Sequence, residues 1–167
     1  KGTRGVGKTT FLLQYAKEKF GTDRSCLFIN MNNFYFSGHS IVDFANEFQK
    51  RGGKVLLIDQ VFKHPEWSKE LRMCYDRYPN LKIVFTGSSV MRLKEENLEL
   101  RDIAKSYNLR GFSFREFLNL QTGMKFRAYS LEEILSTHEQ IAKGVLSKVR
   151  PLDYFCLLYT SDAADEA

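Results

Sequence analysis

The feature that most constrains the fold is a glycine-rich loop followed at once by a helical pattern. Residues 2–9 read Gly-Thr-Arg-Gly-Val-Gly-Lys-Thr and satisfy the pattern G-x-x-x-x-G-K-[ST]. Glycines allow backbone N–H groups to turn inward around a phosphate, and the positive end of the next helix adds to the attraction. From Thr9 to Phe20 apolar residues recur at helical spacing, and Gly21 follows as a stop signal. The sequence therefore predicts a phosphate-binding loop that leads directly into a helix.

The motif assigns roles to individual residues. Lys8 is predicted to reach the β- and γ-phosphates of a nucleotide, and the Thr9 hydroxyl to coordinate Mg²⁺. The alternative is a glycine-rich turn with a solvated lysine, and the helical pattern after the motif argues against it. The predicted nucleotide-binding residues are Gly2, Thr3, Arg4, Gly5, Val6, Gly7, Lys8, Thr9 and Thr10.

Strand-like and helical segments alternate along the first half of the chain. Alternation of this kind requires crossover connections and favours a parallel sheet. The fold class is therefore predicted to be α/β, as a three-layer P-loop fold. Strands are expected over residues 26–31, 55–59 and 81–85, with a further strand over 107–112. Helices are expected over 9–20, after Ser40 and after Pro65.

Two strand ends carry polar groups that complement the loop. The apolar run Val55–Ile58 ends in Asp59, whose carboxylate can help Thr9 to hold Mg²⁺. The next strand ends in Thr-Gly-Ser-Ser, where Ser88 or Thr86 can hydrogen-bond the γ-phosphate or the attacking water. We assign the catalytic role to Ser88. A serine-rich turn that caps a helix is the alternative interpretation of this segment.

Composition and charge limit the classes of partner, cell compartment and metal site that the chain is expected to have. The 167 residues are 43% hydrophobic, which is enough for a core, and contain no apolar run long enough to span a membrane. The net charge of +5 is spread along the chain, so nucleic acid is an alternative partner that no basic run supports. Three distant cysteines form no disulfide pattern, which favours the reducing cytoplasm. The three histidines are isolated from one another, so no metal site with histidine ligands is expected.

The two ends of the chain suggest where its parts begin. A buried strand normally anchors such a loop in mid-sheet, so the first core strand is expected to be missing before Lys1. We expect a P-loop core over residues 1–112 and a helical segment over 113–155, opened by the capping pairs Ser113/Glu116 and Ser130/Glu133. Residues 156–167 end like a translated adapter sequence and are predicted to be a non-native tail.

Four segments together resemble one family. They are GTRGVGKTT, VLLIDQVFKHPEWSKEL, LKIVFTGSS and NLRGFSFREFL, at residues 2–10, 55–71, 81–89 and 108–118. In this combination the chain resembles prokaryotic AAA-type (AAA+-like) P-loop ATPases, whose full-length members carry a C-terminal nuclease-like domain of unknown function. The resemblance implies ATP and Mg²⁺ binding, with hydrolysis of ATP to ADP and phosphate in the parent protein. A protein partner or a second copy of the chain is a separate expectation.

The chain departs from the family pattern at two places. Gln60 stands where the family has a glutamate that polarises the attacking water, and an amide cannot act as a general base. Hydrolysis is therefore expected to be slow, and a non-hydrolysing, ATP-dependent switch is the alternative function. A small-molecule or nucleotide kinase would share the loop, but no arginine-rich lid is evident. The family's arginine pair is also altered, which leaves Arg92, Arg101, Arg110 and Arg115 as candidate arginine fingers.

Overall fold

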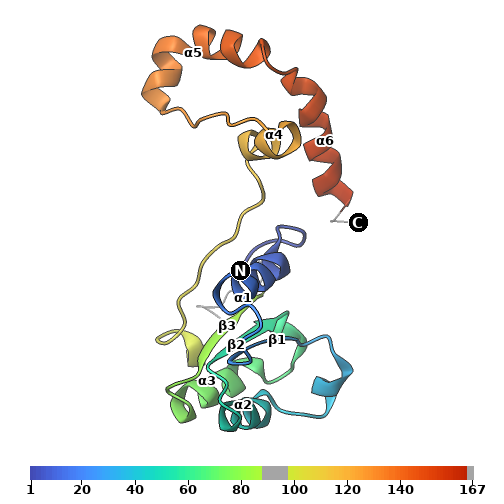
Figure 1. The fold of residues 1–167 in the computed structure, drawn as a ribbon, viewed down its shortest axis with the longest axis vertical. Coiled ribbons are helices and arrows are strands. Elements are labelled where there is room, and N and C mark those ends of the chain that lie inside the picture. Colours follow the sequence, from blue (N-terminus) through green and yellow to red (C-terminus); the bar gives the residue numbers. More distant parts are fainter. Residues whose placement is uncertain (88–97, 165–167) are drawn as a thin grey trace. The chain divides into compact units, whose positions relative to one another are not determined.

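The computed structural model describes residues 1–87 and 98–164, with two compact units, Lys1–Arg110 and the chain from Gly111 onward. The first unit contains a three-stranded parallel sheet in the order β1-β2-β3 (Figure 1). Its strands are β1 (Cys26–Asn30), β2 (Val55–Asp59) and β3 (Lys82–Phe85). All five residues of the central strand β2 are buried, as its unbroken apolar run predicts for a strand covered on both faces. The α/β class and the parallel sheet are confirmed.

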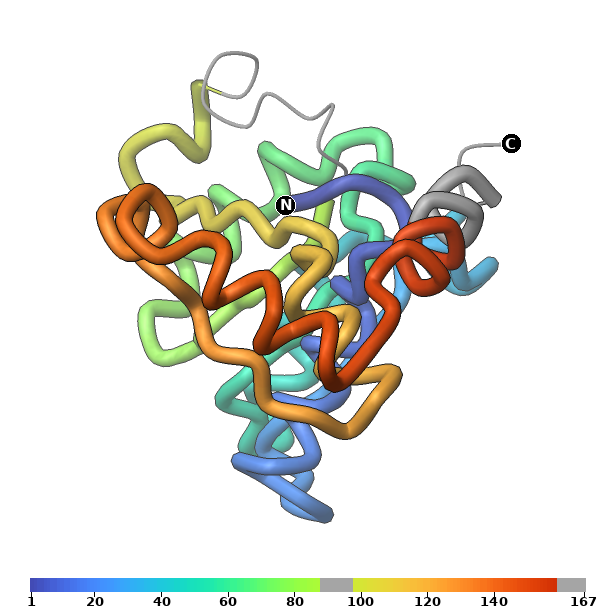
Figure 2. The backbone as a smooth tube through the Cα atoms, turned by 90° about the horizontal axis from the view of Figure 1, so that it is seen from above, coloured from blue at the N-terminus to red at the C-terminus, as the bar shows by residue number. Residues whose placement is uncertain are grey.

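Helices cover both faces of this sheet, and Figure 2 traces the chain through them by colour. Alternate residues of β2 face opposite layers. Leu57 packs with Leu12 of α1, whereas Leu56 and Ile58 pack among residues of α2 and α3. The three helices are α1 (Lys8–Lys19), α2 (Ile41–Lys50) and α3 (Trp67–Arg77), close to their expected positions.

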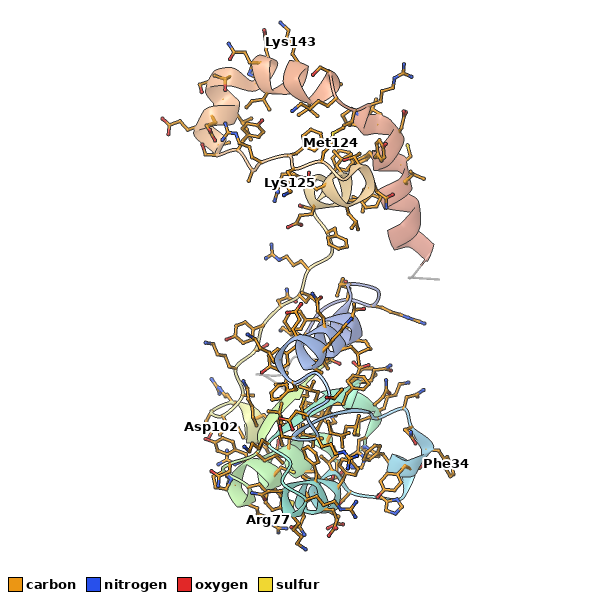
Figure 3. All side chains as sticks on the ribbon, viewed as in Figure 1. Phe34, Arg77, Asp102, Met124, Lys125 and Lys143 are labelled. Atoms are coloured by element: carbon orange, nitrogen blue, oxygen red, sulfur yellow. The ribbon has the colours of Figure 1, made fainter. Side chains whose placement is uncertain are left out.

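Short 3-10 turns link these elements. They are η1 (Phe34–Ser37), η2 (Val61–Lys63) and η3 (Leu98–Leu100). Figure 3 shows Phe34 of η1 extending away from the body of its unit, and the side chain is 90% exposed. The turn η2 directly follows β2 and Gln60, so it lies at the carboxyl edge of the sheet, where ligands of open α/β sheets bind.

The helices begin where their capping residues predict. The Ser40 hydroxyl oxygen accepts a hydrogen bond from the N–H of Asp43 at 3.0 Å. Both sequence-predicted capping boxes form, Ser113 with Glu116 and Ser130 with Glu133. Each box satisfies backbone N–H groups that would otherwise lack partners at a helix start.

The second unit is helical. It contains α4 (Phe114–Thr122), α5 (Leu131–Leu146) and α6 (Pro151–Ala164). The rings of Phe114 and Phe155 meet edge to face at 5.3 Å between centroids and join α4 to α6. Within α5 the backbone departs from helical geometry at Thr137, whose hydroxyl donates to the Glu133 carbonyl oxygen at 2.8 Å. Among the helices described, none has the length and hydropathy needed to cross a membrane.

The strand predicted over residues 107–112 does not form. The segment makes two backbone hydrogen bonds to Lys1, whose amino group donates to the Tyr107 carbonyl oxygen at 2.6 Å and whose carbonyl oxygen accepts from the Leu109 N–H at 2.7 Å. It does not join the ladder of β3. Residues of β3 and of the segment 103–107 instead line a mostly apolar pocket of about 360 Å³. Two bonds to one residue are too few to make a strand.

Candidate functional site

The loop before α1 has a backbone that glycine makes possible. Gly5 and Gly7 have φ angles of 81° and 85°, a region that side chains with a Cβ rarely adopt. Gly7 is also the N-cap of α1, so the strained turn leads directly into the helix. Gly2 is buried, and a Cβ added there would lie 2.4 Å from the carbonyl oxygen of Leu109. The loop is therefore fixed both by its own geometry and by the segment beneath it.

This close approach predicts that Gly2→Ala destabilises the protein. The new methyl group would overlap a backbone oxygen, and such overpacking costs about 1–3 kcal/mol of unfolding free energy. Thermal melting measured by circular dichroism should show the lower midpoint. Gly38→Ala is the matched control, because an added Cβ meets no atom within 4 Å there and φ is −127°. Equal midpoints for the two variants would show that the loop does not depend on this contact.

Lys8, the first residue of α1, folds back over the loop. Its ammonium group donates hydrogen bonds to the carbonyl oxygen of Gly2, at 2.9 Å, and to that of Thr3. Partial burial lowers the pKa of Lys8 below its usual value, and the charge of Asp59 acts in the opposite direction. The ammonium group is therefore held against the loop, and Lys8 and Asp59 line the same cleft.

Asp59 is the buried acid of the site. Its side chain ends the central strand and is 1% exposed. The Thr9 hydroxyl donates to Oδ2 at 2.8 Å, and the Asn30 amide donates to the same oxygen at 3.1 Å. The Thr86 hydroxyl donates to the other oxygen, Oδ1. Donors from the loop helix and from the ends of the two neighbouring strands thus converge on one carboxylate, which offsets the cost of burying its charge.

Gln60 lies beside this acid in an unusual conformation. Its φ of 54° is the only positive value among the non-glycine residues described. The Gln60 N–H donates to Thr86 Oγ1 at 3.1 Å, and the same hydroxyl donates to Asp59. Thr86 therefore holds both the acid and the backbone of the residue predicted to face the attacking water.

The predicted residues meet around one cleft of about 690 Å³. It is lined by Arg4, Gly5, Gly7, Lys8, Thr9, Thr10, Asn32, Asp59, Gln60, Phe62 and Lys63. Gly2, Thr3 and Val6 complete the loop without lining the cleft. Sequence reasoning missed Asn32, Phe62 and Lys63, and also Asn30 outside the cleft wall. Asn30 is found only once the register is known, because it pairs directly with Asp59 across β1 and β2.

Other predicted residues lie elsewhere. Ser88 and the arginine candidate Arg92 fall outside the described residues. Arg101 and Arg110, of the first unit, do not line the cleft. Arg115 belongs to the second unit, where it donates to the Phe126 carbonyl oxygen at 3.4 Å. Among the described arginines of the first unit, Arg4 from the loop lines the cleft.

A comparison with protein families identifies the family of the chain. Residues 1–118 match the family described as AAA domain. The chain belongs to the AAA domain family. No curated protein matches the chain. An AAA domain is a nucleotide-binding, ATPase-like unit. The cleft lies between the loop before α1 and the carboxyl ends of the parallel strands, which is where open α/β sheets bind their ligands. The match ends inside α4, so it covers all of the first unit and the start of the second.

The oxygen donors at the cleft of the AAA domain fit Mg²⁺. This ion prefers oxygen ligands and usually keeps several waters while it binds one or two protein groups and nucleotide phosphates. Thr9 and Asp59 offer a hydroxyl and a carboxylate already in contact at 2.8 Å. The described residues contain no group of three or more His, Cys, Asp or Glu side chains that could hold a metal by themselves. An ion bound here would therefore depend on the nucleotide for further ligands.

Proposed function

We propose that the cleft binds ATP together with Mg²⁺ and hydrolyses ATP slowly to ADP and phosphate. The observation that carries the proposal is the contact between Thr9 of the loop helix and Asp59 of β2, 2.8 Å from the hydroxyl oxygen to Oδ2. It brings together the two protein ligands that Mg²⁺ takes in P-loop enzymes. Residues of the glycine-rich loop line the same cleft beside them.

Each residue has a distinct task in this proposal. The backbone of residues 2–8 and the start of α1 bind the phosphates, and Lys8 neutralises charge on the β- and γ-phosphates. Thr9 and Asp59 would hold Mg²⁺, which when bound polarises the phosphoryl oxygens. Asn30 and Thr86 fix the orientation of the Asp59 carboxylate. The α-, β- and γ-phosphates would thus be fixed before any bond breaks, and positioning is the main source of rate in phosphoryl transfer.

The step that limits the rate is activation of water. Gln60 can orient a water molecule through its amide, but it cannot accept the proton. Asp59 is the only carboxylate among the described residues that line the cleft, and its hydrogen bonds to Thr9 and Thr86 commit it to another task. The missing general base therefore predicts tight binding with slow turnover.

The lack of a general base at Gln60 also favours a second candidate function, a nucleotide-dependent switch. A nucleotide-dependent switch needs to bind ATP and to change its contacts, and hydrolysis need not follow. A neutral Gln60 and the absence of a second carboxylate from the described lining of the cleft fit such a switch. The protein partner or second copy that a switch requires stays a prediction, as do the assignment of Ser88, the limits of the three segments and a cytoplasmic location.

The experiment that tests this function is Asp59→Asn. Removing the charge should weaken Mg²⁺ binding, so the Mg²⁺ concentration needed for half-maximal ATP binding is expected to rise about tenfold or more, as a lost charged contact of about 1.5–3 kcal/mol implies. Titration of Mg²⁺ against protein and a fluorescent ATP analogue measures it.

Asp76→Asn is the matched control for this experiment. Asp76 is an exposed acid on α3 that pairs with Arg72 and does not line the cleft. Its replacement should leave the Mg²⁺ requirement unchanged. A wild-type chain that binds ATP equally well with and without Mg²⁺ would contradict the metal role of Thr9 and Asp59.

A further inference from the structure

The described lining of the cleft contains three cationic side chains, and the motif accounts for two of them. Arg4 and Lys8 belong to the glycine-rich loop. Lys63 belongs to η2, the turn that follows Gln60. It therefore reaches the cleft from the sheet side, where Asp59 and Gln60 also lie.

The turn that carries Lys63 is anchored on both sides. Before it, the N–H of Val61 donates to the Thr86 carbonyl oxygen at 3.1 Å, and the Val61 side chain is completely buried. After it, His64 is buried and its Nε2 lies 3.1 Å from a carboxylate oxygen of Glu70. The His64 N–H also donates to the Val61 carbonyl oxygen at 3.1 Å. The turn η2 is thus held before and after by contacts to Thr86, directly after β3, and to Glu70 of α3.

Between these anchors two side chains remain exposed, Phe62 and Lys63. Both line the cleft, and the Lys63 ammonium lies 5.8 Å from the centre of the Phe62 ring. None of the described carboxylates lies within ion-pair distance of Lys63. A lysine that has no acidic partner among the described residues, on the wall of a cleft proposed to bind phosphates, is placed to meet a negative ligand.

We propose that Lys63 determines specificity for nucleoside triphosphates by binding the γ-phosphate. This inference rests on the proposed function. The glycine loop encloses the β-phosphate, so a third phosphate extends from the loop toward the side of the cleft formed by Asp59, Gln60 and η2. A diphosphate does not reach that far. Lys63 therefore adds affinity for ATP that ADP does not gain.

The test compares ATP and ADP binding to Lys63→Met, which keeps the length of the side chain and removes its charge. Affinity for ATP should fall roughly 10- to 100-fold, as the loss of one charge-assisted hydrogen bond implies, while affinity for ADP changes less than about twofold. Isothermal titration of each nucleotide with Mg²⁺ measures both constants. Lys63→Arg should restore most of the preference for ATP, because it restores the charge.

Lys50→Met is the control, since Lys50 is exposed on α2 and pairs with Glu47 away from the cleft. It should bind both nucleotides as the wild type does. An unchanged ratio of ATP to ADP affinity in Lys63→Met, or an equal loss for both nucleotides, would overturn the role of Lys63 and leave the proposed function intact. A wild-type chain that binds neither nucleotide would overturn the proposed function, and the role of Lys63 with it.

Discussion

Replacing Gln60 by glutamate is expected to raise the rate of phosphate release by about 10²- to 10⁴-fold, the usual contribution of general acid–base catalysis. The two side chains have nearly the same shape, and the left-handed backbone at φ 54° is held by the hydrogen bond from its N–H to Thr86, which the substitution leaves in place. The new carboxylate would lie in the cleft beside Asp59. It could take the proton of an attacking water molecule.

The measurement is phosphate release under single-turnover conditions, with ATP binding measured on the same samples. Gln49→Glu, on the partly buried face of α2 outside the cleft, is the control for a carboxylate placed elsewhere. It should leave the rate unchanged. If Gln60→Glu releases phosphate no faster than the wild type while it still binds ATP, then the missing base is not what limits hydrolysis.

Lys8→Ala is expected to weaken ATP binding by about 10²- to 10⁴-fold. Lys8 is predicted to make a charge-assisted hydrogen bond to each of two phosphates, and two such bonds are worth about 3–6 kcal/mol. The variant also loses the hydrogen bonds from the ammonium to Gly2 and Thr3, so the loop itself is expected to become less ordered. Both effects reduce affinity.

Titration with a fluorescent ATP analogue measures this loss, and circular dichroism checks that the fold is retained. Lys19→Ala serves as the control, because Lys19 lies exposed at the other end of the same helix. It should bind ATP as the wild type does. Binding that survives in Lys8→Ala would mean that the nucleotide lies somewhere other than this cleft.

Much of the first unit could be predicted from the sequence. The apolar run at residues 55–59 predicts a strand buried on both faces, and all five residues are buried. Capping chemistry placed the starts of α2, α4 and α5, because a serine followed three residues later by an acidic residue satisfies N–H groups that the helix leaves free. These features depend only on residues that are close together in the sequence, so they can be predicted from one sequence.

The parts that could not be predicted depend on pairing between distant segments. The contact between Asn30 and Asp59 follows from the register of β1 against β2, which the sequence does not state. The position of Lys63 depends on the anchors of η2 at Thr86 and Glu70. Residues 107–112 look like a strand locally, yet a strand needs a partner along its length, and within the described parts of the chain the backbone of this segment pairs with Lys1 alone. Local pattern therefore predicted the loop residues, Asp59 and Gln60 that line the cleft, but not the rest of its lining.

In the helical unit, too, local features could be predicted from the sequence and packing could not. Its capping boxes form as predicted, but no residue of α5 is buried, although apolar residues recur along the helix. Periodicity indicates which residues of a helix lie together and does not indicate what covers them. Thr137 also interrupts the helix, because its hydroxyl bonds back to the Glu133 carbonyl oxygen.

The most direct test of the central claim is a titration of the wild-type chain with a fluorescent ATP analogue, with and without Mg²⁺, while phosphate release is followed in the same samples. The arrangement of Lys8, Thr9, Asp59 and Gln60 predicts saturable binding that Mg²⁺ strengthens, with phosphate released slowly or not at all. Absence of saturable binding would contradict the assignment of this cleft to ATP, and rapid phosphate release would contradict the role given to Gln60.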